Sequence, residues 1–518
     1  MPLHNQERII ADKGFMLLSR LITAFSVRLH GLRDMSTLQA PRLASGGDAT
    51  FSARYPWWRV VVLLLLLLLS IGCNRVLSWS VPPPTGSVTQ FVAVWMVSFV
   101  PYFAACAVVL ATKGPPVGRW KWLELGLIFV GALVLRLMLL PIWPVLSRDA
   151  WRYLWDANVI LHGYSPYVLA PNSSVLAPLQ DSFIFAQSRF RNVPTIYPPG
   201  SQAIYVLSYL LAPGNLTMLK VIFLGFDMVT CWVLVVLLQR RKLSPQRVLI
   251  YAWCPLPIVE FAVQAHLDVL AITYSLLVLL CASRDGWKWR VLTGFLVGMA
   301  TLAKLYPLLL LVVVLRRKDW ALLATCFSTI FLGYLPFLIL GQGQIFGFFA
   351  DYSGEQSPNG GMIQKTVYWL IHQQLGFPDS NTRIVELIVD ALLVGGVCLL
   401  VLRLRQREGM SMECGALLLF GIVFAISPHI FPWYTTVLLP LIAIVAGPLR
   451  VGRRLSGRGI AVVVVWYFTW TVLIGYFYQD ARDWSIFYLL VYDVVVAGLV
   501  VAALVELFHL WRLRSLSR

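Results

Sequence analysis

VVVLLLLLLLSIGCNRVLSW, residues 60–79, is an almost unbroken apolar stretch. It is long enough to cross a lipid bilayer as one helix, which takes about 20 apolar residues. Similar stretches recur along the 518-residue chain, in which 59% of residues are hydrophobic and only 13% are charged. That composition excludes an ordinary soluble protein. The pattern predicts an all-α polytopic membrane protein.

Further apolar stretches give the expected number of membrane crossings. The pattern indicates about 14 spans, with a range of about 12–14. Several of them are shorter than a bilayer requires, and such segments are tolerated where they line a cavity inside the protein. The expected spans are 60–79, 88–112, 123–146, 217–238, 248–262, 267–282, 291–303, 306–315, 321–341, 384–402, 414–427, 434–447, 459–478 and 486–508.

Basic clusters between the apolar stretches set the expected orientation. With the N-terminus in the cytoplasm, alternate loops such as KGPPVGRWK (113–121), QRRKLSPQR (239–247) and RLRQR (403–407) all fall on the cytoplasmic side. This is the asymmetry that the positive-inside rule describes. The positive-inside rule therefore accounts for the net charge of +18. It forms no single basic face, so a nucleic-acid partner is not expected.

The chain divides into four expected regions. Residues 1–59 form a basic cytoplasmic segment, in which 15–32 is either an interfacial amphipathic helix or a disordered tail. Residues 60–122 hold two spans, 123–447 a catalytic membrane core, and 448–518 a C-terminal pair of spans with a basic tail. The core has two large outer loops, 147–216 and 342–383. Residues 201–213 are expected to form a re-entrant or interfacial helix, because a further span would invert every later loop.

Charge is concentrated at the start of the first outer loop, in SRDAWRYLWDANVILHGYSPY (147–167). On a helix, Asp149, Arg152, Tyr153 and Asp156 share one face. A carboxylate at the membrane surface can accept a proton as a general base, and an arginine can bind a phosphate. The alternative is a solvated helix in which these aspartates and arginines pair with each other.

Other polar residues are predicted to reach the same outer surface. Tyr197 precedes a rigid Pro-Pro-Gly turn, and the QAHLD segment (264–268) places His266 and Asp268 between two apolar stretches. Two residues at this spacing do not make a metal-ligand set. Lys304 is a lone cation at an outer turn, suited either to lipid headgroups or to a lipid phosphate. PHIFPWY (428–434) adds His429, Trp433 and Tyr434, as interfacial aromatic residues or as a surface that stacks on sugars.

Together these motifs resemble C-type (GT-C) membrane glycosyltransferases with a GT-C-like helical bundle and short juxtamembrane helices on the outer face. The group in question includes glycosylphosphatidylinositol mannosyltransferase I and bacterial polyprenol-phosphate-mannose-dependent mannosyltransferases. RDAWRYLWDANVILHGYSPYVLAP, TIYPPGSQAIY, QAHLD, AKLYP and PHIFPWY carry the resemblance, which spans roughly 123–447. Residues 1–120 have no counterpart in it.

The resemblance implies that a hexose, most often mannose, is transferred from a polyprenyl-phosphate donor to a hydroxyl of a lipid or glycan acceptor. Asp149 would be the general base of an inverting single displacement. Arg152, Lys304 and His266 are the candidates for binding the donor phosphate. The remaining candidate substrate contacts are Tyr153, Asp156, Tyr197, Asp268, His429, Trp433 and Tyr434. Asp156 is alternatively a structural partner of Arg152. No Asp-x-Asp motif suits a metal, and a divalent ion stays an open possibility.

Two other functions share the lipid-linked substrate. A flippase or transporter would place its ionisable residues in broken helices at mid-bilayer, whereas here they gather in outer loops. A glycan polymerase or ligase would carry its basic residues in a late outer loop, and 342–383 holds only Lys365 and Arg383. The expected location is the cytoplasmic membrane of a cell envelope, with the active site on the extracytoplasmic side. The sequence leaves the sugar, the acceptor, the linkage and the oligomeric state open.

Overall fold

The computed structural model describes residues 57–80, 87–111, 118–180, 183–347, 366–426, 430–451, 454–478 and 485–516. In these residues the fold is helical apart from one small antiparallel hairpin, β1 (Arg450–Val451) and β2 (Arg454–Leu455), in which Arg450 pairs with Leu455. The structure thus confirms the all-α polytopic prediction. The predicted interfacial helix at 15–32 lies outside the described residues, as does His429.

Eight helices among the described residues are long and apolar enough to cross a membrane. Two of them are built from consecutive shorter elements, and one more includes a π-helical turn. The eight are α2 (Trp58–Trp79), α3 with α4 (Val88–Val97, Phe99–Ala111), α5 (Arg119–Leu139), α9 (Leu216–Arg240), α15 (Trp320–Leu340), α18 (Asp379–Glu408), α22 with η6 (Gly457–Thr471, Val472–Tyr478), and α23, η7 and α24 (Ser485–Tyr488, Leu489–Asp493, Val494–Leu516).

The other six predicted spans are short or interrupted helices. The predicted span 248–262 is not continuous, because the chain breaks at Trp253 and Cys254 ahead of two prolines. The third predicted span also ends early, at Leu139 rather than at residue 146, before Pro141 and Pro144. These shorter elements are η3 (Pro245–Val248), α10 (Leu249–Ala252), α11 (Pro255–Ala262), α12 (Asp268–Ala282), α13 (Trp287–Ala303), η4 (Tyr306–Leu309), α14 (Leu310–Val314), α19 (Met412–Ile426), α20 (Pro432–Thr435) and α21 (Leu438–Val445).

Side chains of the neighbouring helices stabilise the interruption between α10 and α11. A helix break leaves carbonyl groups without their usual partners, and burying them unbonded is unfavourable. Tyr102 donates its hydroxyl hydrogen to the Ile250 carbonyl at 2.6 Å, and the Trp95 indole donates to the Pro255 carbonyl at 3.0 Å. Arg136 donates to the Ala252 carbonyl at 2.6 Å.

The core lies around these interrupted helices. In α10, α11 and α12 nearly every side chain is buried. In the long helices α15 and α18, by contrast, only 11% of the residues in the most apolar stretch are buried. Apolar side chains on so exposed a surface suit a lipid environment. The structure and the composition agree that the chain is an integral membrane protein.

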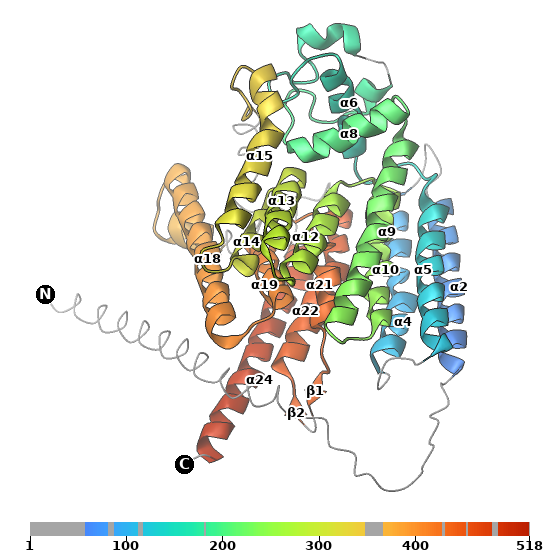
Figure 1. The fold of residues 1–518 in the computed structure, drawn as a ribbon, viewed down its shortest axis with the longest axis vertical. Coiled ribbons are helices and arrows are strands. Elements are labelled where there is room, and N and C mark those ends of the chain that lie inside the picture. The colour runs from blue at the N-terminus through green and yellow to red at the C-terminus, as the bar shows by residue number, and fades with distance from the viewer. Residues whose placement is uncertain are drawn as a thin grey trace, which may run out of the picture.

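A group of short helices covers one end of the bundle. Figure 1 shows α6 (Asp149–Leu161) and α8 (Pro199–Leu211) at this end, with β1, β2 and the end of α24 at the other. The segment 201–213, predicted to be interfacial or re-entrant, corresponds to α8, which packs against α6 and α13. The smaller elements η2 (Ser174–Leu179), α7 (Ile184–Gln187) and the π-helical η5 (Trp369–Gln374) complete the described helices.

Candidate functional site

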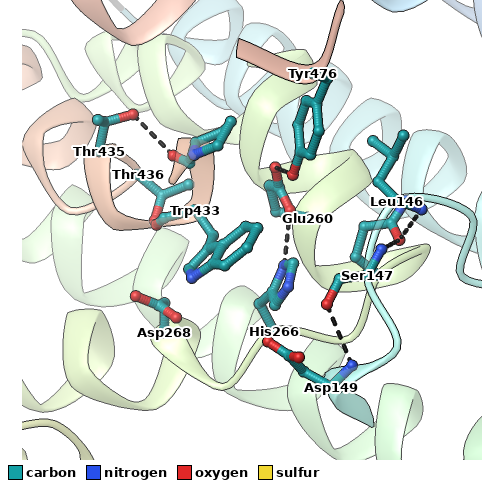
Figure 2. A network of polar contacts seen from close by, with 12 residues as sticks. Leu146, Ser147, Asp149, Glu260, His266, Asp268, Trp433, Thr435, Thr436 and Tyr476 are labelled. Carbon is teal, nitrogen blue, oxygen red and sulfur yellow. Dashed lines mark hydrogen bonds and ion pairs between the residues drawn. The ribbon is translucent and has the colours of Figure 1, made fainter. Parts of the chain in front are cut away.

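The loop before α6 fixes the position of Asp149. The side-chain oxygen of Gln264 accepts hydrogen bonds from the backbone N–H groups of Leu146 at 3.1 Å and Ser147 at 3.3 Å. The backbone N–H of Asp149 then donates to the Ser147 hydroxyl at 3.2 Å. Figure 2 shows the contact between Ser147 and Asp149 in this network. Hydrogen bonds through Ser147 therefore connect Asp149, the first residue of α6, to Gln264 in the loop between α11 and α12.

A lysine–aspartate pair forms another part of the site. Lys304, directly after α13, donates to the carboxylate of Asp268, the first residue of α12, at 2.5 Å. Its ammonium also lies 4.0 Å from the centre of the Tyr434 ring, in a cation–π contact. The Lys304 side chain keeps 21% of its surface exposed, against 2% for Asp268. Burial lowers the pKa of Lys304, and the Asp268 charge opposes that shift.

The Pro-Pro-Gly-Ser segment holds the lysine turn in place. Helix α8 begins at Pro199, and the Ser201 hydroxyl donates to the Ala303 carbonyl, next to Lys304, at 2.8 Å. A Cβ at Gly200 would come within 2.9 Å of the Leu302 carbonyl oxygen, so only glycine permits this approach of α8 to α13. The motif that the sequence suggested as a turn therefore also packs against the turn that carries Lys304.

His266 lies buried between a carboxylate and an aromatic ring. Its Nδ1 is 2.7 Å from a carboxylate oxygen of Glu260, and its ring stacks on Trp433 at a centroid distance of 3.9 Å. The other Glu260 oxygen accepts a hydrogen bond from the Tyr476 hydroxyl at 3.1 Å. Burial lowers the pKa of His266 well below its usual value, and the charge of Lys304 acts in the same direction. The ring is therefore neutral at pH 7.

Burial and the neighbouring charged side chains shift the pKa of Asp149. Burial raises the pKa of the Asp149 carboxyl above its ordinary value. The side-chain hydrogen bond with Ser147 and the charges of Lys304 and Arg189 oppose the rise, while Asp268 adds to it. A carboxylate of raised pKa binds a proton more readily than an ordinary aspartate does. The geometry therefore suits Asp149 for proton abstraction.

Arg152 and Asp156 form a separate, closed cluster. The Arg152 guanidinium bonds Asp156 at 2.7 Å and the backbone carbonyls of Phe190 and Val193 at 2.9 Å each. Asp156 also accepts from the Gln202 amide at 3.2 Å. Arg152 is 5% exposed and Asp156 is 1% exposed. The structural pairing that the sequence analysis considered is present, and it ties α6 to the 190–193 segment.

Tyrosine rings lie beside this cluster. Tyr153 stacks on Tyr205 with ring centroids 4.4 Å apart, and it meets the edge of Tyr197 at 4.8 Å. Tyr153 is buried, and Tyr197 is half-buried. The carboxylate of Asp149 influences the titration of both rings, so the two polar clusters are neighbours.

The structure thus brings most of the predicted residues to one end of the bundle. Lys304 and His266 lie with their partners around Asp149, while Arg152 lies in the adjacent closed cluster. The roles of all these residues in substrate binding stay predictions. The first group is Asp149, His266, Asp268, Lys304, Trp433 and Tyr434, and the second is Arg152, Tyr153, Asp156 and Tyr197.

Several residues of the site were not singled out from the sequence. Glu260 and Tyr476 support His266, Gln264 holds the loop before α6, and Arg189 is exposed with its charge acting on Asp149. Only Glu260 had a sequence signal, as an ionisable residue inside an apolar stretch. The others become visible only through tertiary contacts.

The described part of the site holds no ready-made set of metal ligands. In the part of the chain that the structure describes, no group of three or more His, Cys, Asp or Glu side chains is arranged to hold a metal ion. Asp268 is paired with Lys304, and Nδ1 of His266 contacts Glu260.

Comparison with known proteins agrees with this arrangement. Residues 195–432 match the model of glycosyltransferase family 87, a family of GT-C-type membrane glycosyltransferases. The match includes His266, Asp268 and Lys304 and begins after Asp149. Neither the curated proteins nor the solved structures gave a match. The match covers less than half of the chain, and together with the helical membrane bundle and the polar site at one end it supports a GT-C-type membrane glycosyltransferase.

Proposed function

We propose that this glycosyltransferase moves a hexose, mannose in the first instance, from a polyprenyl-phosphate donor to a hydroxyl group of a lipid or glycan. The reaction takes place at the extracytoplasmic face of the cytoplasmic membrane. The observation that carries the proposal is the placement of Asp149 at the end of an apolar bundle, within the electrostatic reach of Lys304. A lipid-linked phosphate can reach such a site from the bilayer.

The reaction is an inverting single displacement. Asp149 takes the proton of the acceptor hydroxyl while the hydroxyl oxygen forms a bond to the anomeric carbon of the sugar. The bond from that carbon to the phosphate oxygen breaks, and polyprenyl phosphate leaves with the electron pair. No protonated carboxylic acid is required at the leaving group, because the phosphate is already a stable anion, unlike the leaving group of a glycosidase.

Lys304 is the best placed of the three candidate phosphate ligands. It retains exposed surface, and an ammonium can bond a phosphate with donors that Asp268 does not use. Arg152 directs three of its five N–H donors to Asp156 and two carbonyl groups, and it is only 5% exposed. Arg189 adds an exposed positive charge near Asp149. The negative charge that develops on the phosphate is thus met from Lys304 and Arg189.

The test is sugar transfer from radiolabelled polyprenyl-phosphate mannose to a membrane extract. Purified wild type, Asp149→Asn and the control Asp285→Asn are compared, because Asp285 is an exposed aspartate paired with Arg316. We expect transfer by wild type and Asp285→Asn, and a loss of about 10²–10⁴-fold or more in Asp149→Asn, the range for removal of a general base. A folded Asp149→Asn protein that keeps its activity contradicts the role of Asp149.

If wild type binds the lipid but transfers no mannose, glucose and arabinose donors are tested next. Failure with every donor rejects transfer from these lipid-linked sugars. A flippase would then be revealed by movement of the intact lipid-linked sugar across the bilayer of a reconstituted vesicle.

A further inference from the structure

The loop between α11 and α12 carries two buried side-chain nitrogens that have no hydrogen-bond partner in the described structure. They are Nε2 of Gln264 and Nε2 of His266. The two residues are 0% and 1% exposed. Buried polar atoms without a partner are uncommon, because each costs the free energy of its lost contact with water. Their presence in one loop beside Asp149 points to a ligand that supplies the missing bonds.

The contacts of the Gln264 amide determine which of its atoms is the nitrogen. Its oxygen accepts hydrogen bonds from two backbone N–H groups, those of Leu146 and Ser147. A flipped amide would place NH₂ against these donors, so the flip is excluded. The unpartnered atom is therefore a hydrogen-bond donor.

The contacts of the His266 ring determine its tautomer in the same way. Nδ1 faces a Glu260 oxygen at 2.7 Å, and the other Glu260 oxygen accepts from the Tyr476 hydroxyl. Burial raises the pKa of Glu260 well above its ordinary value, so the tautomer depends on the charge of this carboxyl. With Glu260 ionised, both of its oxygens only accept hydrogen bonds, and Nδ1 carries the hydrogen. In the neutral ring Nε2 is then a bare acceptor. Stacking on Trp433 fixes the ring plane.

We propose that Gln264 and His266 form a hydroxyl-binding subsite for the transferred sugar, with Glu260 as the positioning residue that sets the His266 tautomer. The inference rests on the function proposed above and narrows it. A sugar hydroxyl both donates and accepts hydrogen bonds, so it can satisfy one acceptor and one donor. The phosphate of the donor is a diester anion with only acceptor oxygens, so it cannot donate to a bare imidazole nitrogen. His266 therefore recognises the sugar, and the phosphate is left to Lys304.

The tautomer is the first property to test, because it does not depend on enzymatic activity. Protein labelled with ¹⁵N-histidine is examined by NMR at pH 7, and the His266 signals are those that disappear in His266→Phe. His162→Phe, at an exposed position, serves as the matched control for the assignment. We expect a neutral ring with hydrogen on Nδ1. A ring with hydrogen on Nε2, or a charged ring, overturns the proposal.

Lipid binding then distinguishes sugar recognition from phosphate recognition. His266→Phe keeps an aromatic ring against Trp433 but removes both nitrogens. Dissociation constants are measured for polyprenyl-phosphate mannose and for polyprenyl phosphate alone. We expect the affinity for the mannosylated lipid to fall about tenfold or more, and that for the bare phosphate less than about twofold. An equal loss for both lipids, or no loss for either, contradicts the subsite. If wild type binds neither lipid, the proposed donor is wrong, whatever the tautomer.

Glu260 is tested as a positioning residue by the same two measurements. Glu260→Gln allows either tautomer, since an amide offers both an oxygen and an NH₂ group. We expect His266 signals of mixed tautomers and a selective loss of affinity for the mannosylated lipid, with partial recovery in Glu260→Asp. Tyr476→Phe removes only a hydroxyl and provides a milder variant if Glu260→Gln fails to fold. An unchanged tautomer in Glu260→Gln contradicts the positioning role.

Discussion

Two ion pairs near the end of the bundle, Arg152–Asp156 and Lys304–Asp268, each join a candidate phosphate ligand to an aspartate, but they differ in burial. Arg152 is enclosed, with a carboxylate and two carbonyl groups as partners. Lys304 bonds a single carboxylate, faces the Tyr434 ring and keeps part of its surface exposed. Each cation keeps two N–H donors outside these bonds, so the difference lies in exposure. The exposed surface of a cation, rather than its presence in an outer loop, indicates whether it can bind a substrate anion.

The strongest test of this contrast is Arg152→Met. The substitution leaves the Asp156 carboxylate buried with the Gln202 amide as its remaining side-chain partner. Removing one member of a buried pair costs about 3–5 kcal/mol of folding free energy. We expect a clear fall in the thermal unfolding temperature in detergent, and a much smaller fall in Arg240→Met, where the arginine is exposed. Equal stability of the two variants contradicts a structural role for Arg152.

Lys304→Met should cause a large loss of transfer together with a loss of stability, because Asp268, which is 2% exposed, loses its ion-pair partner. Removing a cation that faces the donor phosphate is expected to lower kcat/KM about 100-fold, since charge-assisted hydrogen bonds are about twice as strong as neutral ones. Initial rates at several donor concentrations measure the loss, with thermal unfolding as the control. If Lys304→Met is destabilised as much as Arg152→Met but keeps its transfer activity, Lys304 has a structural role and does not bind the donor.

The pH dependence of transfer sharpens the contrast further. Asp149 works as a base only when ionised, so activity falls as pH drops through its pKa, about tenfold for each further pH unit. Because burial raises that pKa, the acid limb of kcat/KM lies at higher pH than for an ordinary aspartate. Lys304 holds the pKa down, so any residual activity of Lys304→Met should have its acid limb at still higher pH. An acid limb at lower pH in that variant contradicts the electrostatic coupling.

The smallest expected effect belongs to Arg189. Its charge acts on Asp149 from an exposed position, where salt screens it. We expect Arg189→Gln to lower kcat/KM about threefold to tenfold at low ionic strength, and less at about 1 M salt. Arg317→Gln, another exposed arginine, is the matched control. A loss that does not depend on salt would argue against a screened, long-range role.

The apolar stretches predicted the fold well because the bilayer constrains it so strongly. Helices α2, α9 and α15 lie close to their predicted spans, since a stretch of about 20 apolar residues has few other stable conformations in lipid. The interruption between α10 and α11 was harder to place. The sequence analysis predicted one short span over 248–262, and the stability of the break depends on side chains more than 100 residues away in sequence.

The candidate site was predictable only in part. The spacing of Asp149, Arg152, Tyr153 and Asp156 suited the helix that the structure shows over 149–161. Predicted sidedness placed His266 and Trp433 on the same outer surface, but their ring stacking is known only from the structure. The sequence could not show that Arg152 is enclosed by the 190–193 segment, since the fold of that loop is set by tertiary contacts. Nor could it separate Gln264 from an ordinary polar residue, because the bonds to Leu146 and Ser147 join distant segments.

The interrupted helix has a consequence for how the protein can be divided. The carbonyl groups of Ile250, Ala252 and Pro255 receive their hydrogen bonds from residues 95–136, upstream of the family match that begins at 195. A fragment that starts at the match would keep these acceptors in an apolar interior without donors, at a cost of a few kcal/mol each. We therefore expect the upstream helices and the family region to fold together, and a fragment cut at the limits of the match to be less stable than the whole chain.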